Sequence, residues 1–196
     1  MNKIGKTNKK RALEILSAAF KNNDGVLTVV KKDQHIEKRS VELCNYCLTV
    51  SIEKNGAFIT SDEKGVSLIF KSWEKQTFSN WLKGYIRLGQ YCIGWNRALK
   101  IIRRNKEIER RRLKNKHLYF WMLAVEDHTF GLETIKSMRD FVFNYSLNEQ
   151  LPIYAEATSK KTLMLYKRYG FEVYGEWKEN NNGPTVYFIR REWDCE

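Results

Sequence analysis

The sequence has little of what marks disordered, membrane-spanning or metal-binding proteins. Only two of its 196 residues are proline and 11 are glycine, a composition that argues against disorder. No apolar run approaches the roughly 20 residues that a transmembrane helix needs. Three histidines without a spaced set of other ligands predict no metal site. The length is that of one domain, and we expect a single domain over residues 1–196.

The cysteines and the N-terminal residues do not indicate secretion. Cys44 and Cys47 are spaced as C-x-x-C, but no second pair or nearby histidine completes a zinc site, so we interpret them as buried thiols. Residues 3–21 are basic and then apolar, as in a signal peptide. Glu14 interrupts the apolar part and Lys21 closes it. We therefore expect an amphipathic helix in this segment and a cytoplasmic protein.

The net charge of +12 is concentrated in one stretch. Residues 97–116 contain ten Lys or Arg against two Glu, which gives +8 of the total. Such a stretch attracts polyanions: nucleic acid, an acidic protein or a phosphorylated cofactor. No homeodomain, zinc-finger or RNP-type signature accompanies the charge. We therefore interpret the stretch as a solvated helix face and loop, and keep nucleic-acid binding as an alternative.

Helical periodicity dominates the first half of the chain. Apolar residues recur at helical spacing in four segments, which we predict as helices: 11–22, 38–54, 76–91 and 95–112. Residues 23–37 are ambiguous, because GVLTVVKK favours a strand whereas Asp24 suits the cap of a helix. Two short apolar runs separated by DEK, GAFITS and GVSLIFKS, predict a β-hairpin.

The second half alternates between strands and helices. HLYFWMLAV, residues 117–125, is an apolar run suited to a strand that is buried on both faces. A helix is predicted over 129–146, and Pro152 opens a strand, IYAEAT. A second hairpin is predicted from FEVYGEW and TVYFIRRE around the turn NNNGP. The alternation implies parallel pairing and a final antiparallel hairpin, in a mixed sheet flanked by helices.

The helix between these last strands has clear start and stop signals. Ser159 can cap a helix over 160–169. Gly170 suits the left-handed position after its last turn, and Phe171 can pack back on that turn. Tyr166 lies on the apolar stripe of the helix, so periodicity alone favours a role for this residue as a core aromatic.

The C-terminal part resembles a known family. YAEATSKKTLMLYKRYGFEVYGEW, residues 154–177, resembles motif B of the GNAT superfamily of N-acetyltransferases, in a subgroup written roughly as yLEATS-x-x-N-x-x-LYxxxGFEVxGE. Residues 117–120, HLYF, are similar to the HwYL that opens the central strand of that subgroup. The resemblance implies an α/β GNAT-like (acyl-CoA N-acyltransferase) fold: a mixed, mostly antiparallel sheet with a parallel splayed pair and helices on both faces.

The resemblance also implies acetyl transfer from acetyl-coenzyme A to a primary amine by direct attack. The family's central strand, here Leu123-Ala124-Val125, accepts the pantetheine arm, and a backbone N–H polarises the thioester carbonyl. The tyrosine of LYxxxGF maps to Tyr166, which protonates the departing thiolate. The other implied cofactor-binding residues are Phe130, Gly131, Leu132, Glu133, Thr134, Thr158, Thr162, Leu165 and Arg168. For the general base, proximity to the splay leaves Glu126, His128 and Glu156 as candidates.

The loop after the central strand departs from the family pattern. The family loop reads Q/R-x-x-G-x-G/A, but this chain has EDHTFGL with one glycine, Gly131, and a shorter loop. Glu126 and Asp127 oppose the binding of a diphosphate. Either coenzyme A binds through a shortened loop helped by Lys161 and Arg168, or the chain is a degenerate, non-catalytic GNAT-like binding module. No feature of the sequence indicates the acceptor amine, or distinguishes a monomer from a dimer.

Overall fold

The computed structural model describes residues 1–126, 132–178 and 185–194. Within these ranges the strands form one sheet in the order β1-β2-β3-β4-β5-β7-β6. All neighbouring strands are antiparallel except β4 and β5, which are parallel. This confirms the predicted mixed sheet. The strands are β1 (Asn2–Lys3), β2 (Ala57–Ile59), β3 (Gly65–Lys71), β4 (Leu118–Val125), β5 (Ile153–Ala157), β6 (Glu172–Lys178) and β7 (Thr185–Arg191).

The helices fall close to the predicted ranges. They are α1 (Lys9–Phe20), α2 (Asp24–Val29), α3 (Ile36–Glu53), α4 (Phe78–Arg87), a π-helical turn η1 (Leu88–Ile93), α5 (Trp95–Arg111), α6 (Leu132–Glu149) and α7 (Lys160–Arg168). Part of the ambiguous segment forms the helix α2, and its N-cap is Asn23 rather than the predicted Asp24, because the Asn23 side chain accepts hydrogen bonds from the backbone N–H groups of Gly25 and Val26. No helix in the described ranges is long and apolar enough to cross a bilayer.

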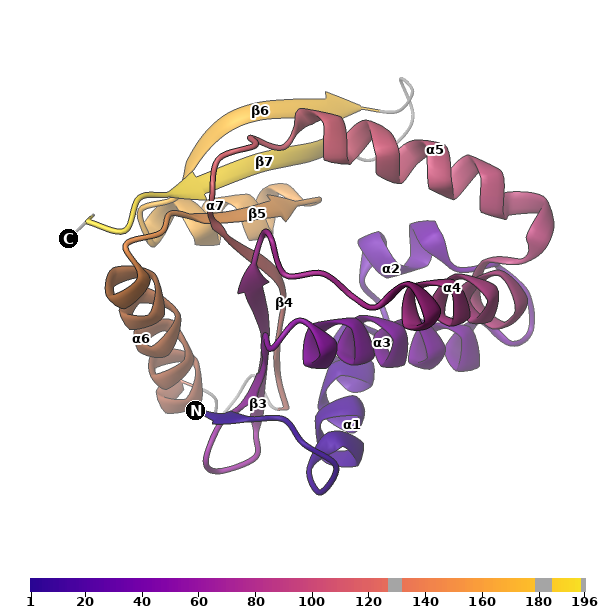
Figure 1. Ribbon diagram of the computed structural model, residues 1–196, viewed down its shortest axis with the longest axis horizontal. Helices are drawn as coiled ribbons and strands as arrows, with labels where there is room; N and C mark the ends of the chain where they lie inside the picture. The colour runs from indigo at the N-terminus through magenta and orange to yellow at the C-terminus, as the bar shows by residue number, and fades with distance from the viewer. Residues whose placement is uncertain (127–131, 179–184, 195–196) are drawn as a thin grey trace.

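Helices cover both faces of the sheet, and the alternation of strand side chains sorts the core into two layers. Helices α1 and α3 lie on one face, whereas α6 and α7 lie on the other (Figure 1). On β3, Val66 and Leu68 point to the first layer and Ile69 to the second. A β-bulge on β4, opposite Leu68 and Ile69 of β3, shifts the register between the two strands. The bulge leaves Trp121 of β4 without a partner in the β3 register.

The start and stop of α7 are as predicted. The Ser159 Oγ accepts a hydrogen bond of 3.1 Å from the backbone N–H of Thr162. Gly170 has a φ of +77°, and the ring of Phe171 packs edge-on against Tyr166 with 4.9 Å between centroids. These local contacts fix where α7 ends and which side it turns to the sheet. The predicted turn over 180–184 and the predicted helix start at 129–131 lie outside the described residues.

Replacing Gly170 tests the left-handed stop of α7. Gly170→Ala should lower the free energy of unfolding by about 1 kcal/mol, because a Cβ disfavours positive φ. A Cβ at Gly5 would meet no atom within 4 Å, and that residue does not have a positive φ. Gly5→Ala is therefore a matched control that should leave stability unchanged. Equal denaturation midpoints for the two variants would contradict the strain at Gly170.

Candidate functional site

The parallel strands β4 and β5 separate soon after they begin. Only two residue pairs join them, Leu118 with Ile153 and Tyr119 with Tyr154. The pairing is supported by a hydrogen bond of 2.9 Å from the Leu118 N–H to the Pro152 carbonyl. Beyond it the strands diverge, and Figure 1 shows β3 and β4 upright while β5, β7 and β6 run across the view. The rest of β4 therefore has no strand partner on the β5 side.

The ladder register identifies which backbone groups of β4 face this gap. The Glu126 N–H donates to the Lys64 carbonyl, directly opposite in the antiparallel ladder with β3. Backbone hydrogen bonding alternates along a strand, so Ala124 bonds toward β3, whereas Leu123 and Val125 present their N–H and C=O groups to the β5 side. Of the predicted segment 123–125, these two residues offer the free backbone edge.

Tyr166 lies on the α6–α7 face of the sheet at this gap. Its ring packs edge-on against Phe120 of β4, with 6.3 Å between centroids, and against Phe171. Burial raises the pKa of the Tyr166 phenol well above its usual value, and the charge of Glu156 raises it further. No hydrogen bond holds its hydroxyl within the described part of the chain. The phenol is therefore protonated at neutral pH and makes no hydrogen bond with another described side chain.

Glu156 lies on the opposite face of the sheet, in a part-buried network that the sequence did not reveal. Arg112 Nε donates to its Oε1 at 2.7 Å, and the Tyr119 hydroxyl donates to its Oε2 at 2.5 Å. Arg112 Nη2 also donates to the Tyr119 hydroxyl at 2.7 Å. Because Tyr119 is on β4 and Glu156 is on β5, this network joins the two strands where they start to diverge.

The charged groups of this network are stabilised by one another rather than by water. Burial opposes the charged form of Arg112, but Tyr119 and Glu156 outweigh it, so the pKa of Arg112 is raised. Burial raises the pKa of Tyr119 well above its usual value. The guanidinium also lies 4.3 Å from the centroid of the Tyr119 ring. Arg112 and Tyr119 therefore fix the carboxylate, and an amine approaching Glu156 would have to displace one of these donors.

The same face carries an aromatic floor with a second cation. Phe70 packs against Tyr119 and Trp121, with ring centroids 5.4 and 5.9 Å apart. Lys54 Nζ lies 4.4 Å from the centroid of the Phe70 ring. Burial lowers the pKa of Lys54, and the charge of Arg112 lowers it further. The face of the sheet opposite Tyr166 thus combines rings in tilted and edge-on contact with the two cations and Glu156.

Glu126 and Glu156 occupy different parts of the structure. Glu126 follows the last residue of β4, and its exposed carboxylate forms an ion pair of 2.6 Å with Arg11 of α1. Glu156 is two residues beyond the paired end of β5 and faces the aromatic floor. The electrostatic contact with Tyr166 involves Glu156. His128, the third candidate for the base, lies outside the described residues.

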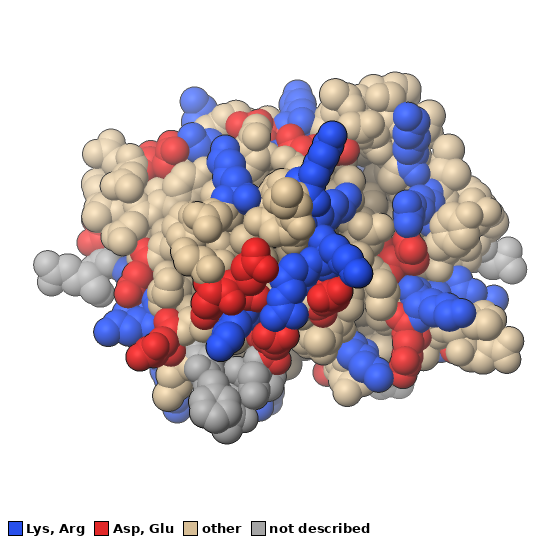
Figure 2. All heavy atoms as spheres, turned by 90° about the horizontal axis from the view of Figure 1, so that it is seen from below, with Lys and Arg blue, Asp and Glu red and all other residues tan. Residues whose placement is uncertain are grey.

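The first turn of α6, where the resemblance implies a diphosphate, is surrounded by acidic groups. The Thr134 hydroxyl already donates to Asp62 Oδ2 at 3.0 Å, and Glu133 is exposed beside it. A shallow pocket is lined by Asp62, Glu133, Thr134 and other residues of this turn. Carboxylates at a helix N-terminus interact favourably with its dipole and so take the place of an external anion. Figure 2, seen from below, shows acidic and basic side chains intermingled on this face.

The remaining predicted residues are distributed along the two sides of the gap. Leu132 and Leu165 are exposed, at 78% and 51%, while Thr158 is half-buried. Thr162 is exposed, and its side chain accepts a hydrogen bond from the Ser159 hydroxyl. Lys161 and Arg168 are exposed on α7. Phe130 and Gly131 lie outside the described residues.

The three cysteines that the structure describes take no part in this site. Cys44, Cys47 and Cys92 are free and buried, as the interpretation of C-x-x-C predicted for the first two. Burial raises the pKa of Cys44 to about 11 and of Cys92 to about 12, so both thiols are protonated and unreactive. No group of His, Cys, Asp and Glu in the described ranges is arranged to hold a metal ion.

We compared the chain with known proteins to find which folds share this geometry. No protein-family model matches the chain, and no curated protein matches it in sequence. A Corynebacterium glutamicum protein described as histone acetyltransferase HPA2 and related acetyltransferase is 16% identical, with a TM-score of 0.66 over 97% of this chain and 94% of that one. Arylalkylamine N-acetyltransferase 2 from Aedes aegypti is 13% identical, with a TM-score of 0.64 over 98% of each chain.

A GNAT-family acetyltransferase from Desulfovibrio desulfuricans is 12% identical, with a TM-score of 0.54 over 98% of this chain and 97% of that one. The chain has the GNAT fold. At these identities the likeness establishes the GNAT fold alone. The residues that act within that fold must be inferred from the chain's own geometry.

Replacing Arg112 tests whether the network stabilises the diverging strands. Arg112→Met should lower the free energy of unfolding by roughly 2 kcal/mol, because it leaves the part-buried Glu156 carboxylate without its cation. The double variant Arg112→Met/Glu156→Gln should recover part of that loss. Arg110→Met, which removes a cation that is 73% exposed and paired with Glu107, is the control and should have almost no effect. Additive losses in the double variant would show that the ion pair contributes nothing.

Proposed function

We propose that the chain transfers an acetyl group from acetyl-coenzyme A to a primary amine by direct attack of the amine on the thioester. The observation that carries the proposal is an edge of β4 beside a protonated phenol, neither of which has a hydrogen-bonding partner on this side among residues 1–126, 132–178 and 185–194. Leu123 and Val125 present backbone groups to the gap, and Tyr166 packs on Phe120 of the same strand. The free edge supplies N–H donors for a pantetheine amide or a thioester oxygen.

Tyr166 is the proposed proton donor to the leaving thiolate. Its raised pKa keeps the phenol protonated, so the proton is present when the thiolate leaves. In water a thiol has a pKa near ~8.5 and a phenol near ~10. Burial in the gap would raise both values, because it disfavours both anions. Proton transfer therefore depends on contact between the two groups, and general acid assistance of this kind contributes about 10²–10⁴-fold.

The amine must lose its proton before it attacks, and the two described candidates for the base suit different routes. Glu156 faces the aromatic floor and lies close enough to influence Tyr166 electrostatically. Its position supports removal of a proton from an amine that enters across Tyr119 and displaces one of the two donors. Glu126 is exposed at the end of β4 and paired with Arg11, which supports a role at the mouth of the gap only. We prefer Glu156.

The acceptor we propose is an amine with an apolar or aromatic body. Phe70, Tyr119 and Trp121 form an aromatic cluster in tilted and edge-on contact on the proposed acceptor face, and a further aromatic ring packs favourably on such a cluster. A structural neighbour named arylalkylamine N-acetyltransferase is consistent with this class of amine. Arg112 and Lys54 put positive charge on the same face, so binding of the neutral amine is favoured over the ammonium.

A second candidate function is a GNAT-like binding module that has lost coenzyme A. The acidic groups at the first turn of α6 favour this alternative. Asp62 already accepts a hydrogen bond from the Thr134 hydroxyl, and Glu133 lies beside it. Calorimetric titration with acetyl-coenzyme A and with dephosphorylated pantetheine analogues separates the two functions. Binding of both ligands with similar affinity would mean that the arm is bound and the diphosphate is not. Absence of binding to either at millimolar ligand would leave only the non-catalytic module.

Turnover of the Tyr166→Phe variant tests the proton donor. The change should lower acetyl transfer to an arylalkylamine by roughly 10²-fold while binding of acetyl-coenzyme A is kept, because only the hydroxyl is removed. Tyr169→Phe removes a hydroxyl from the next turn of the same helix, where the ring packs on Phe143, and should leave turnover unchanged. Release of coenzyme A thiol and the acetylated product are both measured. An unchanged rate for Tyr166→Phe would show that this tyrosine has only a structural role.

A further inference from the structure

The segment that runs through α4, η1 and the start of α5 exposes an unusual number of large apolar side chains. Phe78 is 75% exposed, Leu99 68% and Trp95 63%, and none of the ten residues of α4 is buried. Other exposed apolar side chains of this segment are Trp81, Leu82, Tyr85, Ile86 and Tyr91. Large exposed apolar patches are rare on monomeric proteins and mark surfaces that bind something.

The same segment has no negative charge. Residues 75–106 contain eight Lys or Arg and no Asp or Glu. Lys83, Arg103 and Lys106 are exposed, so their charge is available at the surface. A stretch of 32 residues without an acid is notable in a chain that has 23 Asp and Glu in all. The partner that fits such a segment carries negative charge as well as apolar surface.

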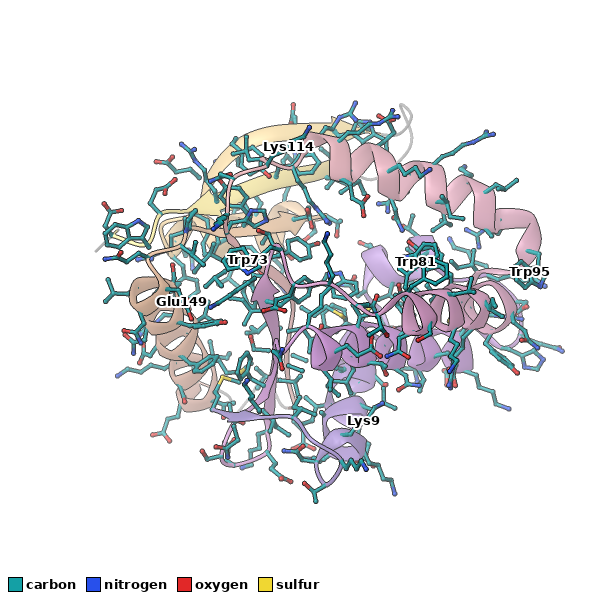
Figure 3. All side chains as sticks on the ribbon, in the orientation of Figure 1. Lys9, Trp73, Trp81, Trp95, Lys114 and Glu149 are labelled. Atoms are coloured by element: carbon teal, nitrogen blue, oxygen red, sulfur yellow. The ribbon has the colours of Figure 1, made fainter. Side chains whose placement is uncertain are left out.

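Helical spacing places the apolar and basic side chains together. On α4, Phe78, Leu82 and Ile86 follow one another at intervals of four residues and therefore share one face. On α5, Leu99 lies four residues before Arg103 and seven before Lys106, so these three side chains share another. Figure 3 shows Trp81 and Trp95 at the same end of the molecule, far from Glu149 of α6. Trp95 packs over Gly89 of η1, which connects the two helices.

We propose that this α4–α5 face, formed by Phe78, Leu82, Lys83, Ile86, Trp95, Leu99, Arg103 and Lys106, binds an anionic lipid surface. Aromatic and aliphatic side chains flanked by Lys and Arg are the composition of helices that lie in the membrane interface. The apolar side chains enter the acyl boundary while the cations meet the headgroups. The sequence predicted no membrane partner because it lacks a spanning segment, a criterion that a helix lying on the surface does not have to meet.

Charge and composition favour lipid over the other partners. In a symmetric pair of copies the basic face of one chain would meet the basic face of the other, and like charges repel. Nucleic acid would use the cations and could stack on aromatic rings, but it gives no role to Leu82, Ile86 and Leu99. An anionic bilayer uses all three kinds of side chain.

Vesicle co-sedimentation of the full chain tests the proposal. We expect binding to phosphatidylcholine vesicles that contain phosphatidylserine, weak binding to phosphatidylcholine alone, and a loss of binding as salt is raised. Phe78→Ser/Leu99→Ser should weaken binding by at least about tenfold, because it removes the insertion of two apolar side chains. Lys83→Gln/Arg103→Gln/Lys106→Gln should weaken it by about fivefold per cation. All five side chains are exposed, so thermal unfolding should be almost unchanged.

Matched variants outside the face provide the controls. Leu147→Ser removes a leucine of α6 that is 51% exposed, and Lys3→Gln/Lys6→Gln/Lys10→Gln removes three exposed cations near the N-terminus. Both should bind vesicles like the unchanged chain. Absence of binding to anionic vesicles, or equal binding by all variants, would overturn the proposal. Binding to mixed oligonucleotides that Phe78→Ser/Leu99→Ser does not affect would overturn it in favour of nucleic acid. A dimer in light scattering that this variant dissociates, without vesicle binding, would overturn it in favour of a second copy.

Discussion

The divergence of β4 from β5 is the constraint on which the candidate site depends. Two residue pairs hold the strands together, and the later residues of β4 that face the gap, Leu123 and Val125, have backbone groups that must find another partner. Unpaired N–H and C=O groups inside a sheet are costly unless water or a ligand satisfies them. The protein stabilises the start of the gap with side chains, Tyr166 and Phe120 on one face and Tyr119 and Glu156 on the other. The free edge therefore begins where those contacts end.

The two sides of the gap carry charges of opposite sign, and this difference affects which ligand can bind. The face with the aromatic floor has Arg112 and Lys54, whereas Asp62 and Glu133 lie at the first turn of α6. A thioester arm is uncharged and is compatible with either end, but a diphosphate favours the cations and is repelled by the carboxylates. The electrostatics thus separate the binding of the arm from the binding of the nucleotide. A donor whose affinity comes mostly from its arm fits this chain better than one held by its phosphates.

Local signals in the sequence predicted α7 and its surroundings well, but the sequence did not indicate the contacts between residues that are far apart along the chain. Ser159, Tyr166 and Gly170 lie within twelve residues, so capping, periodicity and the left-handed stop are all visible in one window. The network of Arg112, Tyr119 and Glu156 joins residues that are 44 and 37 positions apart. It depends on the strand order and on the register of β4 beside β5, which composition and periodicity do not encode. The bulge on β4 was missed for the same reason, since it is a property of two paired strands.

The basic stretch shows why a count of charges cannot assign a role. The sequence favoured a solvated face for residues 97–116, but the period of α5 divides these cations into two sets. On the inner side Arg97 donates to the carbonyls of Val30 and Thr28, and Arg104 is buried. After the helix ends, Arg112 turns to Glu156. On the outer side the remaining cations stay in solvent beside exposed apolar side chains. Three of the ten cations, Arg97, Arg104 and Arg112, thus stabilise the fold and the site, and they are not available to a partner.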